Sequence, residues 1–532
     1  MSKLAFLAKW GVAALLMTSL TSCEDILEQY FPHKPNPTTP SFPPLGQEIS
    51  FYALSGGSRL DAYSTKDAAT RISSVAISGL GSGEKLLAID FRPATGQLYG
   101  VSSASRLYVI NQNTGVARAI GAGAFTPALG GNLVGFDFNP TVDRIRLVTS
   151  TGQNLRLNPE TGTVAATDGS IKDDTGVTLT GAAYTNNRNG VSTTALYAIN
   201  TQNQQLYLVN PPNDGTVVPV GSLNLPVSGN GGFDIDATTG TALGLYSVNG
   251  QSTLFTVDLT TGAARALARY PASLNYSGLA IPTRLVAYAL DTQRHIKEPI
   301  QYNGLYTIDP MVSSGYFRRE IGGLTDREEV VGLDFRPATS QLYLLTSANR
   351  LYTLNPATAE ATLVATLSIP LEGGIYGFDF NPVADHIRIV SVSGQNLRVN
   401  PVDGVAIADG RISPSGSRIT GAAYNNNFAG ATTTSLYVTH RSTAPQFSYT
   451  GTLYLQNPPN EGTLVKIAPL SSGIMHLDIG GTTNVAYAYG DESDGSYATS
   501  KIYTLNLTTG ALTPLRTITD PVLHGFTVGL GF

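Results

Sequence analysis

Apolar and polar residues alternate in short segments from Ile49 to the end of the chain. In QLYLLTSANRLYTLN (Gln341–Asn355), Leu342 and Leu344 fall on one face and Tyr343 and Leu345 on the other. A period of two is typical of β-strands. Turn sequences such as RPATG, NPETG and DLTTG separate the segments, and their glycines suit the positive-φ position that leads into the next strand. We therefore predict an all-β chain of short strands joined by hairpins.

One phrase recurs along the chain: an apolar, glycine-containing strand, often with Asp at its centre, followed by a turn. Its copies are about 50 residues apart, and the order of its variants repeats five and five with an offset of about 240 residues. Gly135–Pro159 and Gly377–Pro401 are identical at 17 of 25 positions. The phrase begins at Leu86, Leu133, Leu179, Asn230, Tyr276, Val330, Ile375, Ile419, Ile474 and Phe526. The chain is therefore expected to be a duplication of a five-unit module.

Each unit has the pattern of four strands, as in the blades of a β-propeller. The first segment, Ile49–Ile77, has three strand-like runs but lacks the opening phrase. The last phrase, from Phe526, has no strands after it. We expect Tyr276–Pro282 to close one ring by joining Ile49–Ile77. In the same way, Phe526–Phe532 would join Arg284–Gly322. Two five-bladed β-propeller-like modules are favoured over one ten-bladed ring, because rings above eight blades are unusual.

The repeated phrases resemble a known bacterial family. GLDFRPAT, RLYTLNPAT, GFDFNP, SGQNLR, GAAYNNN and LYLQNPPN are similar to the motifs of domain of unknown function 4394. The resemblance covers nearly all of residues 49–532, twice over. It implies that each copy can fold alone, and it implies no activity.

The N-terminus has the pattern of an export signal. Lys3 and Lys9 form a basic region before an apolar stretch, Trp10–Leu20, that is too short to span a bilayer. The stretch ends in Leu-Thr-Ser-Cys. This resembles a bacterial lipoprotein signal, which implies removal of residues 1–22 and lipidation of Cys23, the one cysteine of the chain. The alternative is an ordinary secretory signal with a chance cysteine.

The predicted organisation follows from these patterns. Residues 1–22 are a signal peptide and 23–48 a lipidated Cys with a Pro-rich tether, which is a semi-rigid spacer. The first β-propeller-like module is 49–282 and the second is 283–532. The acidic pair Glu24–Asp25 resembles the export signal of some surface lipoproteins, or is part of a solvated tether. We expect an outer-membrane lipoprotein of a bacterial cell envelope, either periplasmic or surface-exposed.

Composition argues against several functions. The formal net charge is −5 and no run of Lys or Arg occurs, so no nucleic-acid partner is expected. The six histidines have no metal-ligand spacing, and no nucleophile elbow, P-loop or dinucleotide fingerprint is present. We therefore expect no catalytic residue, metal or cofactor, and lean against an enzyme. The membrane is contacted through the lipid anchor only.

Charged residues inside the duplicated stretch are the first candidate site. In the predicted hairpin, Arg146 and Arg156 lie side by side, which is unfavourable unless a negative group lies between them. Asp137 and Asp143 are the nearest acids. The second copy retains all four groups as Asp379, Asp385, Arg388 and Arg398.

Two interpretations of this set remain open. It is a structural charge network within or between blades, or an arginine pair that binds an anion. The structural interpretation is favoured, because the central Asp recurs in other units as Asp90, Asp234, Asp334 and Asp478.

Polar loops are the second candidate site. Thr185–Thr194 follows Tyr184, and Asn425–Thr434 follows Tyr424. Their amides suit sugars or peptides, although Asn also satisfies turn backbone. The candidate ligand-binding residues are Tyr184, Asn186, Asn187, Tyr424, Asn426 and Asn427. A second pair of polar loops, Asn210–Thr216 and Asn457–Thr463, shares a Pro-Pro turn.

The leading hypothesis is a lipid-anchored, non-catalytic protein that binds or scaffolds, with a glycan or protein ligand. The rival is a carbohydrate-active hydrolase or lyase that uses Asp and Arg residues of a ring channel. A purely structural envelope protein is the third possibility.

Overall fold

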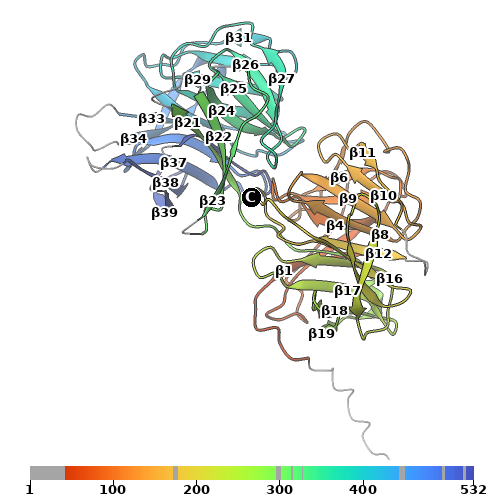
Figure 1. Ribbon diagram of the computed structural model, residues 1–532. Helices are drawn as coiled ribbons and strands as arrows, with labels where there is room; N and C mark the ends of the chain where they lie inside the picture. The colour runs from red at the N-terminus through yellow and green to blue at the C-terminus, as the bar shows by residue number, and fades with distance from the viewer. Residues whose placement is uncertain are drawn as a thin grey trace, which may run out of the picture. The chain divides into compact units, whose positions relative to one another are not determined.

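Ten four-stranded antiparallel sheets account for nearly all regular structure in the protein (Figure 1). The structure is a computed structural model that describes residues 42–171, 178–294, 301–312, 315–325, 328–442, 450–493, 498–518 and 523–532. The expected signal peptide, Cys23 and most of the expected tether lie outside these residues. All ten sheets belong to one unit, Pro44–Phe532. Within the described ranges, no helix has the length and apolar character needed to cross a membrane.

The first module contains five sheets. In the spatial order of their strands, they are β20 (Tyr276–Ala280), β1 (Ser50–Ser55), β2 (Arg59–Ser64), β3 (Ser73–Ala76); β4 (Leu86–Phe91), β5 (Leu98–Ser102), β6 (Leu107–Ile110), β7 (Ala117–Ile120); β8 (Val134–Asn139), β9 (Arg144–Thr149), β10 (Asn154–Leu157), β11 (Val164–Thr167); β12 (Leu179–Tyr184), β13 (Leu196–Asn200), β14 (Gln205–Val209), β15 (Val217–Ser222); and β16 (Val227–Ile235), β17 (Ala242–Val248), β18 (Gln251–Val257), β19 (Ala264–Arg269).

The second module repeats this arrangement. Its sheets are β40 (His524–Val528), β21 (Ala287–Arg294), β22 (Gln301–Ile308), β23 (Tyr316–Glu320); β24 (Val330–Arg336), β25 (Gln341–Thr346), β26 (Arg350–Leu354), β27 (Ala361–Thr366); β28 (Tyr376–Asn381), β29 (His386–Ser391), β30 (Asn396–Val399), β31 (Ala406–Ala408); β32 (Ile419–Tyr424), β33 (Leu436–Arg441), β34 (Gly451–Gln456), β35 (Leu464–Leu470); and β36 (Ile474–Ile479), β37 (Ala486–Ser493), β38 (Ala498–Leu505), β39 (Leu512–Ile518). Two short 3-10 helices span Ala272–Leu274 and Pro459–Glu461.

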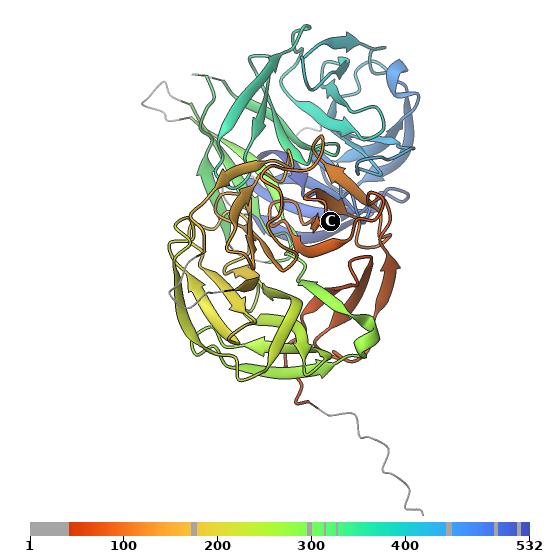
Figure 2. The same cartoon turned by 90° about the vertical axis from the view of Figure 1, so that its right-hand side faces the viewer.

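The innermost strands of each module form a closed cycle. In the first module β4, β8, β12, β16 and β20 contact one another in that order, and β20 contacts β4 (Figure 2). In the second module β24, β28, β32, β36 and β40 do the same. Each cycle closes after five strands, which confirms two five-sheet propeller-like modules and excludes the ten-bladed alternative.

Closure of each ring joins distant parts of the chain. β20 pairs with β1, with Leu279 opposite Ala53. β40 pairs with β21, with Val528 opposite Ala287. Both pairings were predicted from the incomplete units at the ends of the modules. Each pairing gives the closing strand, β20 or β40, a partner in its sheet. An exposed sheet edge is thereby removed.

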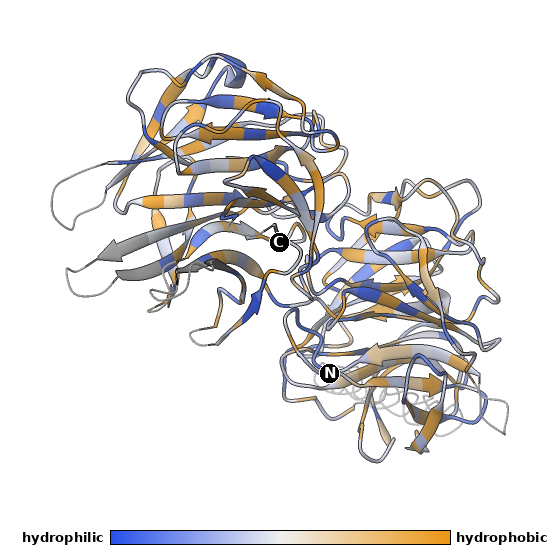
Figure 3. Ribbon diagram, turned by 45° about the horizontal axis from the view of Figure 1, so that its top comes forward, coloured by the Kyte–Doolittle hydropathy of each residue, from blue (hydrophilic) through white to orange (hydrophobic). Residues whose placement is uncertain are grey.

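Apolar residues on both faces of the inner strands form the core. Every residue of β12 is buried, whereas the outermost strand β3 is mostly exposed. Each apolar cluster is shared by consecutive sheets, and Tyr99 of β5 packs edge-on against Phe138 of β8 at 5.2 Å between ring centroids. Hydrophobic segments lie along the strands of both modules (Figure 3). Burial on two faces explains why the sequence carries apolar residues on both sides of a strand.

Glycine permits close packing of the innermost strands. A Cβ added at Gly232 of β16 would lie 1.9 Å from the backbone nitrogen of Leu279 on β20. Because the clashing atom belongs to the main chain of β20, which is paired with β1, neither strand can move aside without disturbing the ring.

This close approach makes a testable prediction about stability. Gly232→Ala should lower the free energy of unfolding by about 3 kcal/mol or more, because overpacking cannot relax against backbone. Gly123→Ala is the matched control, since Gly123 is exposed and a Cβ there meets no atom within 4 Å. Urea unfolding of both variants measures the difference. Equal midpoints for the two would contradict the packing argument.

Candidate functional site

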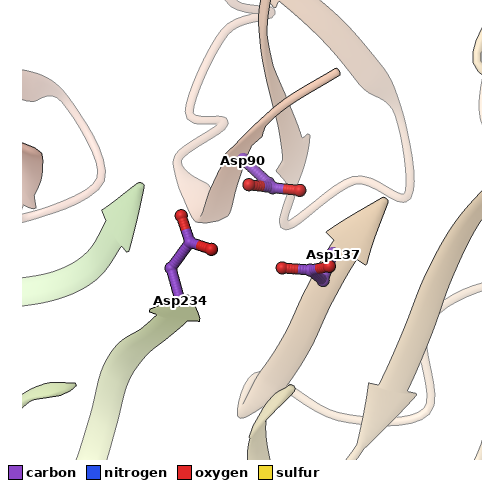
Figure 4. Close-up of side chains that lie close together, drawn as sticks. All are labelled: Asp90, Asp137 and Asp234. Carbon is purple, nitrogen blue, oxygen red and sulfur yellow. The ribbon is translucent and has the colours of Figure 1, made fainter. Parts of the chain in front are cut away.

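The inner strands of the first module bring three carboxylates together (Figure 4). Asp90 is on β4, Asp137 on β8 and Asp234 on β16, and one oxygen from each lies within 4.8 Å of the others. Each residue is 1% exposed. We call these residues the first aspartate triad. Asp334, Asp379 and Asp478 form the second aspartate triad with the same spacing in the second module.

Three of the five inner strands carry the acid, and the other two carry small residues. Ala183 in GAAY occupies the position that Asp137 occupies in GFDF, and Ala280 occupies it on β20. The equivalent positions of the second module are Ala423 and Thr527. A ring of five inner strands therefore presents three carboxylates at one level rather than five.

Each aspartate accepts a hydrogen bond from the main chain of the next inner strand. The Asp90 carboxylate accepts from the backbone N–H of Phe138 on β8 at 2.8 Å. It therefore links its own sheet to the neighbouring one. The equivalent bonds run from Tyr184 to Asp137 (3.0 Å), Ile281 to Asp234 (2.6 Å), Phe380 to Asp334 (2.9 Å), Tyr424 to Asp379 (3.0 Å) and Val528 to Asp478 (2.6 Å).

Burial disfavours the charged form of the triad carboxyl groups. Loss of hydration, reinforced by the neighbouring carboxylates, raises the pKa of Asp90 and of Asp137 well above the usual range. Burial raises the pKa of Asp234 to about 7. Among the described residues, no cationic side chain forms a salt bridge with any member of either triad. Burial lowers the pKa of the nearby His476 to about 3, so this imidazole is neutral at pH 7 and adds no positive charge.

The triads were not predicted as possible metal ligands from the sequence. They are the groups in the described part of the chain where three ligand-bearing side chains come together. The recurrence of Asp in the repeated phrase is visible in the sequence, but the three aspartates of each triad are far apart along the chain. Only the convergence of inner strands places them within reach of one ion.

The predicted arginine pair is present, but a different acid lies between its members. Arg146 and Arg156 are register partners on β9 and β10. Asp168, just beyond β11, accepts from Arg146 at 2.5 Å and from Arg156 at 2.8 Å. Asp137 belongs instead to the first triad, and Asp143 is bound by Arg92. The expectation that Asp137 and Asp143 neutralise the arginine pair is therefore corrected.

The second module repeats this division. Arg388 and Arg398 share Asp409, at 2.7 and 2.8 Å. Asp385 pairs with Arg336, and Asp379 belongs to the second triad. The eight charged residues singled out in the sequence thus serve three separate arrangements: the aspartate triads, the arginine–aspartate clusters and an Arg–Asp pair between consecutive sheets.

Four of the five N–H donors of the Arg146 guanidinium have acceptors within the protein. Arg146 is 2% exposed, and besides Asp168 its guanidinium donates to Asn154, Asn213 and the Tyr184 hydroxyl. Arg388 has the same set of partners in the second module. Burial and four internal hydrogen bonds favour a structural role for both arginines.

The candidate residues of the polar loops make contacts that shape the loops. Tyr184 is buried, and Asn186 adopts φ +53° while its amide donates to the carbonyl of Thr193 at 3.0 Å. Asn187 is buried, and its Oδ1 has no hydrogen-bond partner in the described structure. Tyr424, Asn426 and Asn427 have matching places in the second module. A ligand role for these six residues stays a prediction.

The two kinds of polar loop meet at a cavity in the first module. Its volume is about 470 Å³, and it is lined by the end of the Thr185–Thr194 loop and the start of the Asn210–Thr216 loop. Its polar lining consists of Asn139, Thr141, Tyr184, Ser192, Thr193, Thr194 and Asn210. No lining residue is charged at neutral pH, so the cavity can donate and accept hydrogen bonds but offers no acid or base for proton transfer near pH 7.

The shared aspartate of the arginine pair makes a testable prediction. Asp168→Asn should lower the free energy of unfolding by about 3 to 5 kcal/mol, because it leaves a buried guanidinium and two adjacent like charges uncompensated. Asp258→Asn is the control. The Asp258 side chain accepts a hydrogen bond from the Thr260 N–H, and Asn506 accepts the same bond from Thr508 in the equivalent turn. An asparagine at position 258 should therefore keep this hydrogen bond. Chemical denaturation of both variants measures the effect, and an unchanged Asp168→Asn midpoint would contradict it.

Comparison with known proteins identifies a family without an assigned activity. No curated protein matches the chain. A solved structure titled "Structure of U3-55K" aligns with 77% of this chain and 89% of its own, at 9% identity and a TM-score of 0.24, which is too slight to support an inference. The profile of the family described as Domain of unknown function (DUF4394) matches residues 59–280 and again 305–527. The chain therefore belongs to the DUF4394 family and carries two copies of its domain.

Proposed function

We propose that the protein is a lipid-anchored, non-catalytic binding protein of a bacterial envelope, and that the cavity of its first module binds a neutral saccharide. The observation that carries the proposal is the uncharged cavity where the two polar loops meet. Its volume of about 470 Å³ falls within the range of ordinary ligand sites.

The chemistry of the lining favours a neutral ligand. Hydroxyl groups of Ser192, Thr193 and Thr194 and the amides of Asn139 and Asn210 match the donors and acceptors of a sugar. A charged ligand would lose hydration in this cavity without meeting an opposite charge. The absence of a charged lining group also favours retention of the ligand over its conversion.

The rival enzyme hypothesis has less support. A glycosidase needs two carboxyl groups that flank an accessible glycosidic bond. The aspartates at the ring centres are about 1% exposed and hold backbone N–H groups. Arg146 and Arg388 are occupied by Asp168 and Asp409. These contacts leave no exposed acid pair among the residues first considered for catalysis.

The anchoring part of the proposal rests on the sequence. Cys23 follows an apolar stretch and precedes a Pro-rich segment, which together suit acylation and a spacer from the membrane. The proposal places the protein at the outer membrane, on its periplasmic or outer face. The membrane is contacted through the lipid, and no nucleic-acid partner is involved.

Lipidation at Cys23 can be tested directly. In a Gram-negative host fed labelled palmitate, the full chain should carry the label. Cys23→Ala should abolish labelling, because alanine has no thiol with which the lipid can form a thioether. Ser22→Ala is the control, since it keeps a small residue before the cysteine. Labelling is read on the purified protein, with mass spectrometry of the N-terminal peptide. An unlabelled wild-type chain would refute lipidation.

Another prediction concerns the cavity. A neutral glycan array followed by calorimetry should identify a saccharide, and Ser192→Trp should weaken its binding at least tenfold by filling the cavity. Ser192 is exposed, so this change should leave the melting temperature unaltered.

Thr70→Trp, at an exposed position in the connection between β2 and β3, controls for a surface tryptophan. Binding that survives Ser192→Trp would show that the cavity is not the site. A peptide ligand, or no ligand at millimolar concentration, would overturn the saccharide proposal.

A further inference from the structure

The aspartate triads concentrate negative charge where water does not reach it. Asp90, Asp137 and Asp234 are each 1% exposed, and none forms a salt bridge with a described residue. Burial of an uncompensated carboxylate is costly, and each module buries three within reach of one another. Hydrogen bonds to backbone N–H groups stabilise single carboxylates but do not offset the repulsion among them.

One oxygen of the first triad points to a missing ligand. Both oxygens of Asp90 and both oxygens of Asp234 accept backbone N–H groups. Asp137 accepts the Tyr184 N–H through Oδ1, whereas its buried Oδ2 has no hydrogen-bond partner among the described residues. Figure 4 shows the three carboxylates facing a common centre. A buried, unpartnered oxygen in that place is a ready ligand for a cation.

A small cavity lies beside the second triad. Its volume is about 10 Å³, about that of one water molecule. It is lined by Leu333, Phe378 and Leu477, each of which directly precedes an aspartate of the triad. The cavity therefore lies one residue along the inner strands from the triad, and it is lined by none of the three aspartates.

We infer that each aspartate triad binds one divalent cation through its carboxylate oxygens, and that this cation is Ca²⁺. Three carboxylates and water are the hard oxygen ligands that Ca²⁺ prefers. Two ligands on opposite sides of an ion are separated by twice the metal–oxygen distance. Oxygens within 4.8 Å of one another can therefore share an ion at about 2.4 Å. Ca²⁺ takes oxygen ligands at about 2.3–2.6 Å, whereas Mg²⁺ requires about 2.0–2.1 Å.

The ion has a structural role and does not depend on the proposed saccharide site. It joins three of the five innermost strands of a module, namely β4, β8 and β16 in the first. It neutralises charge that the fold otherwise buries without a partner. Two ions per chain follow from the presence of two triads.

Metal analysis and thermal unfolding test the inference on the purified full chain. After treatment with EDTA and desalting, addition of CaCl₂ should restore two calcium ions per chain, measured by inductively coupled plasma mass spectrometry. At a free concentration one hundred times the dissociation constant, Ca²⁺ should raise the melting temperature by about 5 to 10 °C. MgCl₂ at equal concentration should raise it less.

Isosteric variants separate a ligand from a structural hydrogen-bond acceptor. Asp137→Asn and Asp379→Asn should each leave one calcium ion per chain, and the double variant none. An amide oxygen can still accept the Tyr184 or Tyr424 N–H, and loss of a charge relieves repulsion. In EDTA these variants should therefore melt at or above the wild-type temperature, which shows that they fold.

Asp61→Asn is the matched control. Asp61 is as buried as the triad members but is paired with Arg59 and Arg71. This variant should be less stable and still bind two ions. The inference is overturned if wild-type protein binds no calcium at millimolar concentration, or if both triad variants retain two ions.

Discussion

The innermost strand of each sheet has one edge with no strand beside it, and the ring depends on satisfying that edge. Its backbone N–H groups point toward neighbouring inner strands that approach too closely to admit a side chain at Gly232. Buried N–H groups need a partner. An aspartate reaching from the preceding strand supplies it, as Asp90 does for Phe138. The same interaction fixes the lateral position of one blade against the next.

These inter-strand hydrogen bonds bring carboxylates close together, and the two modules reduce the resulting repulsion in different ways. Five aspartates at one level would be prohibitive, and two of the five positions carry small residues. In the second module the Thr527 hydroxyl lies 3.0 Å from an Asp334 oxygen and 2.7 Å from an Asp478 oxygen, and its single hydrogen can be donated to either. In the first module Ala280 takes that position, and Asp137 retains an oxygen without a partner among the described residues. The aspartates hydrogen-bond neighbouring inner strands, but they also bury three carboxylates close together. A cation at the centre would offset the second effect without disturbing the first.

The fold was predictable from sequence because its signals are local or repeated. Period-two patterns located the strands, and the incomplete first and last units identified β20 and β40 as closing strands. The arginine pair was also predictable, since a hairpin makes Arg146 and Arg156 cross-strand neighbours. The acid that neutralises this pair, Asp168, was not predictable. Asp168 follows β11, whose register against β10 shifts at Arg156 and Leu157, and such a bulge has no clear signal in the sequence. The triads and the cavity depend on where separate sheets and loops meet, which a single sequence does not show.

The pairing of first and last strands has a consequence for how each ring assembles. Leu54 on β1 and Ser277 on β20 are 223 positions apart, yet their contact completes the first ring. Bringing such distant segments together costs more loop-closure entropy than forming a hairpin, which favours closure of the ring after the hairpins have formed. Until then β1 presents an unpaired edge that can pair with other chains. A partly folded chain is therefore exposed to aggregation until its closing strand pairs, and truncation of the last strand alone would leave the second ring open.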